Sequence, residues 1–165
     1  MTDHKRTARP ILATCLIILS MLLIAGAVSS CSGKDRITSY GLTAQDLTIS
    51  HEKGVSPVDS RVFAPGDEIY IRFSLSGFKL DSEGNLWIQE DLVMNDPSGV
   101  PALTRQNLID DRVPPPEGMT SIPVDNTITL FSTVQPGTYT IQINVRDKIG
   151  GGAVYIEADV TVQAK

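Results

Sequence analysis

The last third of the chain alternates strictly between apolar and polar residues, and this pattern restricts the possible fold more than any other feature. Every second residue is apolar from Tyr139 to Val145 and again from Val154 to Val162, with a Gly-rich segment, 147–152, between the two runs. Successive side chains of a β-strand point to opposite faces of a sheet, so a period of two indicates strands with one buried face. We therefore expect a β-hairpin that closes the fold.

The same period recurs earlier in the chain, and no stretch after residue 31 has the 3.6-residue period of an amphipathic helix. The clearest earlier run places Ile69, Ile71, Phe73 and Leu75 on one face, after a turn at 65–67. The predicted strands are 46–51, 69–75, 86–94, 100–104, 127–131, 139–145 and 154–162. About seven short strands separated by turn residues are typical of a single antiparallel β-sandwich.

Two features of the middle of the chain leave alternatives open. Glu90 falls on the apolar face of the strand predicted at 86–94, so either that face opens at Glu90 or a β-bulge resets the register. The segment 108–123 is the longest without a strand pattern, and it contains Asp110, Asp111 and Arg112 followed by three prolines, 114–116. It is either a crossover between the two sheets or an exposed strap that docks a partner.

The sequence Val134-Gln135-Pro136-Gly137-Thr138-Tyr139, followed by an alternating strand, a Gly-rich turn and a last alternating strand, resembles the closing hairpin of immunoglobulin-like and fibronectin type III-like bacterial modules. The resemblance implies an Ig-like sandwich over about residues 65–165. It also implies a tyrosine corner, in which the Tyr139 hydroxyl bonds a nearby backbone group. The cysteine pair of antibody domains is absent. The resemblance carries the fold and no activity.

Trp87 is the only tryptophan, and its position in the alternation is polar, next to Gln89 and Asp91. If it faces outward, it is a candidate ligand contact, because exposed indole rings are common in binding surfaces. If a bulge changes the register, it belongs to the core, and we expect the core position.

The N-terminal segment predicts export. Lys5, Arg6 and Arg9 precede a run without any charge, 11–28, which is the arrangement of a secretory signal. After this run, Val28-Ser29-Ser30-Cys31 resembles the lipobox of bacterial lipoproteins. The resemblance implies cleavage before Cys31 and lipidation of its thiol, so that Cys31 anchors the chain to membrane lipid. Alternatively the 18-residue run stays uncleaved as a membrane helix, since about 20 residues span a bilayer.

These features divide the chain into a signal peptide or anchor helix at 1–30, a tether at 31–44 and a β-sandwich domain at 45–165. The domain is expected outside the cytoplasm, held at a membrane. By the same resemblance, Ser32 after the cysteine favours the outer membrane if the bacterium is Gram-negative.

Composition narrows the function classes. Removing residues 1–30 takes away three of the 14 basic and one of the 19 acidic residues, which leaves a net charge of −7. A clustered positive charge for nucleic acid is therefore missing. After this removal Cys31 is the only cysteine left, so no internal disulfide can form, and His51 is the only histidine left. The oxygen-rich run 81–85 lacks the ligand number of an EF-hand, and a hairpin turn explains it.

We find no nucleophile–base pair, phosphate loop or metal cluster in the sequence, so we expect no catalysis, no metal and no cofactor. The leading expectation is a non-catalytic, membrane-anchored module that binds another envelope protein or acts as its accessory subunit. The alternative is a module that binds carbohydrate or peptidoglycan, which needs exposed aromatic residues such as Trp87.

Overall fold

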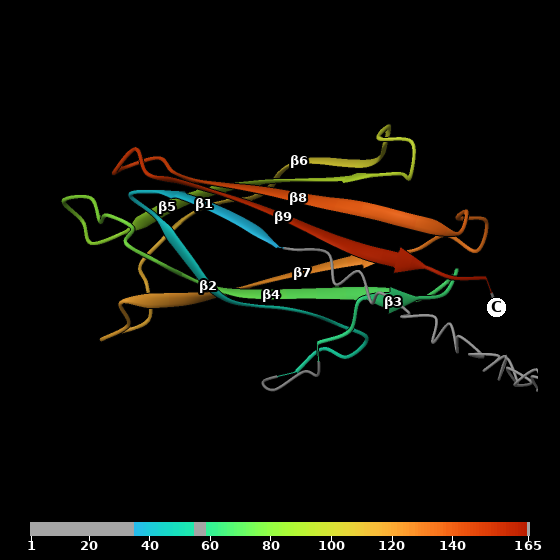
Figure 1. The fold of residues 1–165 in the computed structure, drawn as a ribbon. Coiled ribbons are helices and arrows are strands. Elements are labelled where there is room, and N and C mark those ends of the chain that lie inside the picture. The colour runs from blue at the N-terminus through green and yellow to red at the C-terminus, as the bar shows by residue number, and fades with distance from the viewer. Residues whose placement is uncertain (1–34, 55–58, 165) are drawn as a thin grey trace, which may run out of the picture. The chain divides into compact units, whose positions relative to one another are not determined.

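The computed structural model describes residues 35–54 and 59–164, and it is all-β, with two sheets packed face to face (Figure 1). The larger sheet has the order β1-β9-β8-β5-β6, with the short β3 beside β9, and the smaller sheet has the order β2-β4-β7. Every pairing is antiparallel except that of β3 with β9. The strands are β1 (Arg36–Tyr40), β2 (Thr43–Ser50), β3 (Val62–Phe63), β4 (Glu68–Ser76), β5 (Leu86–Asn95), β6 (Pro101–Val113), β7 (Ser121–Thr129), β8 (Gly137–Asp147) and β9 (Ala153–Val162).

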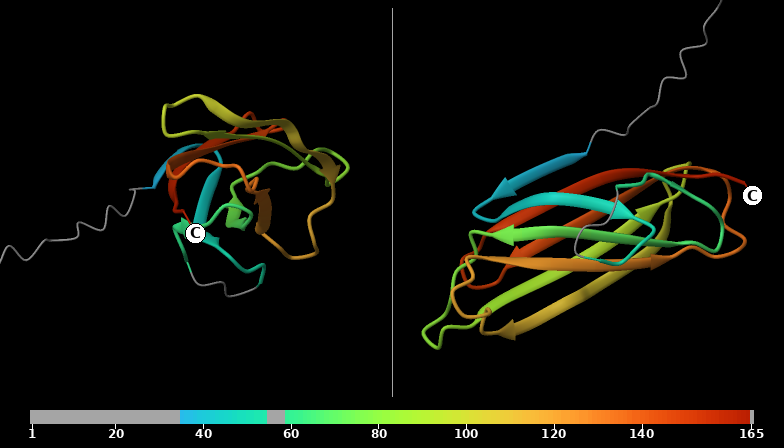
Figure 2. Two further views of the ribbon diagram at one scale, coloured as in Figure 1. Left: turned by 90° about the vertical axis from the view of Figure 1, so that its right-hand side faces the viewer. Right: turned by 90° about the horizontal axis from the view of Figure 1, so that it is seen from below.

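The hydrophobic core lies between the two sheets, which Figure 2 shows as two layers. It is made by the inward-facing residues of the alternating strands, as the period of two predicts. Ile69, Ile71, Phe73 and Leu75 of β4 are all buried, and so are the inward sets of β8 and β9. The predicted all-β class and the closing hairpin are thus confirmed.

The hairpin of β8 and β9 is in register over its whole length, from Gly137 opposite Val162 to Arg146 opposite Ala153. At its start, the buried Tyr139 donates a hydrogen bond of 2.9 Å from its hydroxyl to the backbone carbonyl of Gln135. This is the bond that the tyrosine-corner resemblance implied. It ties the loop before β8 to the buried end of the strand.

The first strands begin earlier than the sequence indicated. The predicted strand 46–51 is in fact β2, which starts at Thr43, and it is preceded by β1, which pairs with β9 inside the segment expected to be a tether. Leu42, between the two strands, is fully buried. β1 was missed because it is an edge strand whose five residues are all exposed, so its sequence has no alternation to detect.

The prediction of a strand-free segment at 108–123 was wrong at both ends. β6 continues to Val113 and β7 starts at Ser121, so only 114–120 connects the two sheets. β6 has a bulge where it pairs with Glu90 and Leu92 of β5, and its Asn107 is in the left-handed region at φ 51°. The bulge interrupts the alternation of β6, so the sequence does not reveal this strand. The middle of the segment is therefore the crossover that one of the two interpretations expected.

Several predictions concern residues outside the described ranges. The signal run, the alternative anchor helix, the lipobox and Cys31 all lie before residue 35. Within 35–54 and 59–164 there is no helix with the length and hydropathy needed to cross a membrane.

Candidate functional site

Trp87 points outward from the larger sheet, so the expectation that it belongs to the core was wrong. Its two neighbours in β5, Leu86 and Ile88, are buried, while 36% of Trp87 is exposed. The bulge lies in β6 rather than before Trp87, so β5 keeps its phase from Leu86 to Met94. The indole Nε1 donates a hydrogen bond of 2.7 Å to Asp110 of β6. This bond holds the ring in one orientation on the surface.

Trp87 is the first member of a row of hydrogen-bonded side chains that crosses three neighbouring strands. Asp110 also accepts a bond of 3.5 Å from the amide of Gln89 in β5. The oxygen of that amide accepts two bonds from Arg146 of β8, at 3.1 and 3.0 Å. Arg146 in turn donates to Asp91 at 2.7 Å. We name Trp87, Asp110, Gln89, Arg146 and Asp91 the tryptophan row.

The row is fixed at its far end by the bulge in β6. The backbone N–H of Asn107 donates a hydrogen bond of 2.9 Å to Asp91. This N–H group, together with Arg146, lowers the pKa of Asp91, so Asp91 is ionised at neutral pH. The bulge thus supplies a backbone donor that a regular strand would have used in the ladder.

Sequence reasoning found only Trp87 of this row. The alternation places Gln89 and Asp91 beside it on the outer face, but Asp110 falls in the segment without a strand pattern, and nothing in the sequence distinguishes Arg146. These residues come together only through strand pairing. Gln89 lies between Asp110 of β6 on one side and Arg146 of β8 on the other. A single sequence does not give this register.

The acidic run at 81–85 forms a turn, as expected from its residues. One carboxylate oxygen of Asp81 accepts the backbone N–H groups of Glu83 and Asn85, each at 2.9 Å, and the other accepts two bonds from Arg112. The bond from Asn85 and the one from Arg112 are the main reasons that the pKa of Asp81 falls to about 2. Among the described residues, no three His, Cys, Asp or Glu side chains are grouped as metal ligands.

His51 has a structural environment. Its Nε2 lies 2.8 Å from the carbonyl oxygen of Val62, which only accepts, so Nε2 carries the proton. The ring packs against Phe63, with centroids 4.3 Å apart. The imidazole therefore fixes β3 to the end of β2.

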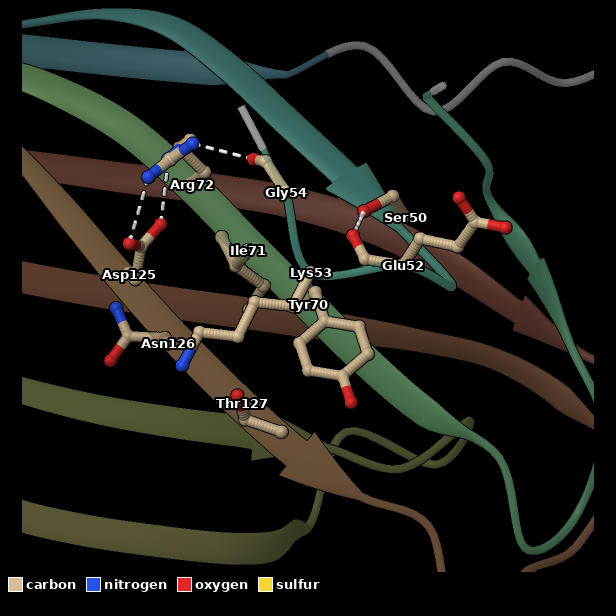
Figure 3. Close-up of a pocket in the computed structure, with 10 residues that line it drawn as sticks. All are labelled: Ser50, Glu52, Lys53, Gly54, Tyr70, Ile71, Arg72, Asp125, Asn126 and Thr127. Carbon is tan, nitrogen blue, oxygen red and sulfur yellow. Dashed lines mark hydrogen bonds and ion pairs between the residues drawn. The ribbon is translucent and has the colours of Figure 1, made fainter. Parts of the chain in front are cut away.

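The outer face of the smaller sheet carries a shallow polar notch, shown in Figure 3. Arg72 of β4 bonds Asp125 of β7 at 3.0 Å and the carbonyl of Gly54 in the loop after β2. The free space in the notch is about 10 Å³, no more than one water needs. A space of this size offers little to a ligand.

A different arrangement occurs inside the sandwich, where Glu90 of β5 and Asn126 of β7 point inward from opposite sheets. Glu90 is fully buried and Asn126 is 5% exposed. Neither carboxylate oxygen of Glu90 nor Nδ2 of Asn126 makes a hydrogen bond of standard length. Burial raises the pKa of Glu90 to about 7, and the nearby Asn126 amide opposes the shift only in part. Glu90 stays on the inner face because β5 keeps its alternation there, and the bulge that the second interpretation expected lies in the partner strand β6.

Two apolar cavities open beside this pair, between β6 of the larger sheet and β7 of the smaller one. The first, about 340 Å³, is bounded by the crossover and is named the proline cavity; its walls include Ile88, Ile109, Val113, Pro115, Ile122 and Val124. The second, about 280 Å³, is named the phenylalanine cavity; its walls include Met94, Leu103, Ile128, Leu130 and Phe131. Arg105 of β6 separates them, since it donates a bond of 3.2 Å to the carbonyl of Thr127 in β7.

Comparison with known proteins gives the fold and no family. No protein-family model matches the chain, and no curated protein sequence matches it. Among solved structures, a Niemann-Pick type C2 protein from Japanese carpenter ant is similar, at 10% identity and a TM-score of 0.51, over 76% of this chain and 96% of that one. The C-terminal domain of wzt is similar at 8% identity and a TM-score of 0.53, over 81% and 79%.

A third similar structure is the alkylpurine DNA glycosylase AlkC of Pseudomonas fluorescens, bound to DNA containing an abasic site analogue. The identity is 13% and the TM-score is 0.50, over 76% of this chain but only 31% of the glycosylase. At such identities the likeness is one of fold alone, and the three proteins share no stated activity.

Proposed function

We propose that the chain is a non-catalytic binding module of the cell envelope, held outside the cytoplasm by lipid on Cys31, and that it binds another envelope protein through the tryptophan row. The observation that carries this proposal is the row itself. Tryptophan and arginine are the residues most enriched at energetic centres of protein interfaces. Here both are already held in position by side-chain bonds, so little conformational freedom remains to be lost on binding.

The finer fold assignment also belongs to this proposal. We assign the domain to the immunoglobulin-like sandwiches, in which strands A, B and E share one sheet and C, F and G the other. The order β2-β4-β7 in one sheet and the neighbours β5, β8 and β9 in the other support the assignment. So does the bond between Tyr139 and Gln135.

Binding of carbohydrate or peptidoglycan is the second candidate. The indole of Trp87 offers an apolar ring face, and Gln89, Asp91 and Arg146 offer donors and acceptors beside it. A sugar ring needs both kinds of contact. The small number of exposed aromatics on this sheet favours the protein partner over the glycan.

The binding proposal is tested with Trp87→Ala in the full-length protein, expressed in its own membranes and captured after mild cross-linking. We expect a stoichiometric partner with the natural protein and at least a tenfold lower recovery with the variant. Tyr40→Ala is the matched control, because Tyr40 is 76% exposed on β1, at the opposite edge of the same sheet. Repeated recovery of no partner, or equal losses in both variants, contradicts the proposal.

The glycan candidate is separated from the first by co-sedimentation with purified peptidoglycan and by a glycan array. Binding that Trp87→Ala abolishes would favour the glycan.

The anchor is tested by the intact mass of the membrane-extracted protein. A chain that starts at Cys31 and carries acyl groups is the expected result. A mass that starts at Met1 refutes the lipoprotein assignment and supports the uncleaved helix.

A further inference from the structure

The side of the sandwich where β6 and β7 form the two sheet edges is built differently from the rest. The larger sheet ends in β6, and the smaller sheet ends in β7 after only three strands. The cavities of about 340 and 280 Å³ lie between these edges. The inner face of β6 is incompletely covered there, since Leu103 and Ile109 are only half-buried, whereas the inward residues of β5 are buried. We call this region the β6–β7 cleft.

The free edge of β7 offers backbone groups to this cleft. The carbonyl of Thr127 accepts a bond from Arg105 of β6, so it points away from β4. The N–H of Leu130 bonds Asp67, on the β4 side. Because alternate residues of an edge strand direct their backbone groups to opposite sides, Asp125, Thr127 and Thr129 present theirs to the cleft. Pro123 shares this parity, and an edge is where a strand tolerates a missing N–H.

The two cavities are spaced along this edge. The proline cavity is lined by β7 residues 122–124 and the phenylalanine cavity by 128–130, which are six residues apart. At about 3.3 Å per residue, the separation is roughly 20 Å. In an added strand, side chains at positions i and i+6 point to the same face and have this spacing.

Two buried polar side chains lie between the cavity-lining segments of β5 and β7. Asn126 lies between the two cavity-lining segments of β7, and Glu90 is opposite Ile109, a wall of the proline cavity. The carboxylate of Glu90 and the Nδ2 atom of Asn126 lack hydrogen-bond partners and are at least 95% buried. The polar groups that the cleft itself offers are Arg105, a wall of the phenylalanine cavity, and the backbone of Asp125 and Thr127 on the β7 edge.

We propose that the β6–β7 cleft receives an extended segment of a partner protein, which adds to β7 as a fourth strand of the smaller sheet. Two apolar side chains of the segment, six residues apart, fill the two cavities, and the residues between them lie beside the polar stretch of β7 at 125–127. Strand addition explains the open backbone edge and the paired cavities together. Neither a small apolar molecule nor a flat protein surface would use both.

This site is separate from the tryptophan row, which lies on the outer face of the larger sheet, so the two proposals can fail independently. The test is a selection of random nine-residue peptides on the full-length protein in detergent micelles. The expected result is enrichment of peptides with apolar residues at two positions six apart and polar residues between them. Selection of no peptides, or of peptides without this spacing, overturns the proposal.

The best peptide is then synthesised with N-methyl groups on alternate amides. Methylation along one edge should weaken binding at least tenfold, and methylation along the other edge should change it less than twofold, because only one edge of an added strand faces β7. Equal, small effects of both methylations indicate apolar binding without strand addition and refute the proposal. Displacement of the peptide by self-association of the protein identifies a second copy as the occupant, which also refutes it.

Two variants and one control variant complete the test. Arg105→Ala frees the Thr127 carbonyl and should tighten peptide binding several-fold. Val124→Trp fills the proline cavity and should remove the preference for one of the two apolar positions, whereas Tyr40→Ala, on the opposite edge of the larger sheet, should leave peptide affinity within twofold. Unchanged urea midpoints show that each variant is folded. If a folded Val124→Trp keeps both apolar preferences, the cavity assignment is wrong.

Discussion

The domain buries two carboxylates in different ways. Asp147, 3% exposed, lies at the turn between β8 and β9, where its oxygens accept three backbone N–H groups, from Lys79, Ile149 and Gly150, each at 2.9 Å. Glu90, fully buried, lies in the middle of β5, and neither of its oxygens has a hydrogen-bond partner. The first closes one end of the sandwich, and the second borders the open cleft.

The difference shows where a β-sandwich can accommodate a buried charge. In a turn, several backbone N–H groups are free, and an aspartate can accept them locally. In the middle of a strand, the backbone groups are already used in the ladder, so a carboxylate depends on side chains of the facing sheet. β7 offers only the amide of Asn126, which does not complete the bonding.

The largest expected effect comes from removing the satisfied carboxylate. Asp147→Ala leaves three backbone donors without their acceptor, at about 1–3 kcal/mol each when they are buried. We expect a loss of about 3 kcal/mol or more in the free energy of unfolding, measured by urea denaturation. Asp147→Asn, which keeps one acceptor oxygen, should lose clearly less. A loss below about 1 kcal/mol in Asp147→Ala would remove the contrast between the two sites.

Removing the unsatisfied charge of Glu90 should raise the free energy of unfolding instead of lowering it. The folded protein holds the Glu90 proton more tightly than the unfolded chain, since the pKa is about 7 in the fold and about 4.5 in a free side chain. The stability that this difference gives is complete below about pH 4.5 and is lost as the pH rises through 7, in total roughly 3 kcal/mol at 1.36 kcal/mol per pKa unit.

Glu90→Gln does not titrate, so it should match the natural protein near pH 4 and exceed it by roughly 3 kcal/mol at pH 8. Urea midpoints measured at both pH values check this prediction. The difference between the two proteins cancels the contributions of the other titrating groups. A variant that is less stable than the natural protein at pH 8 would mean that the Glu90 charge is compensated.

The smallest effect concerns the other end of β8, where Tyr139 lies near the start of the strand. Tyr139→Phe removes the hydroxyl that bonds the Gln135 carbonyl and should lower the free energy of unfolding by about 1 kcal/mol. The carbonyl lies near the surface, so water replaces part of the lost bond. Thermal or urea unfolding measures the change, and a neutral result would show that the tyrosine corner contributes only packing.

The strands β4, β8 and β9 could be predicted well from the sequence and the edge strand β6 poorly, for a physical reason. β4, β8 and β9 are covered on one face by the core, so their apolar residues alternate strictly. β6 is an edge strand with a bulge and charged residues on both faces, and its pattern is that of a loop. A strand that depends on a neighbour for its pairing leaves little trace in its own sequence.

The candidate sites follow the same division. The outward phase of Trp87 was visible in its alternation with Leu86 and Ile88, and the expectation of a bulge there obscured it. The partners in the tryptophan row come from β6 and β8, and only the register brings them together. The cleft could not be predicted, because an incompletely covered face depends on the number of strands in each sheet.

The early start of β1 changes how an anchored protein of this kind would be placed at a membrane. If Cys31 carries the lipid, five peptide steps join it to Arg36, which reach at most about 18 Å even when fully extended. This linker, residues 31–35, leads into β1, which is one edge of the larger sheet, and β6 is the other edge. With lipid on Cys31, so short a linker would keep the β1 edge near the lipid surface, whereas the β6 edge would stay open to molecules that approach from the far side.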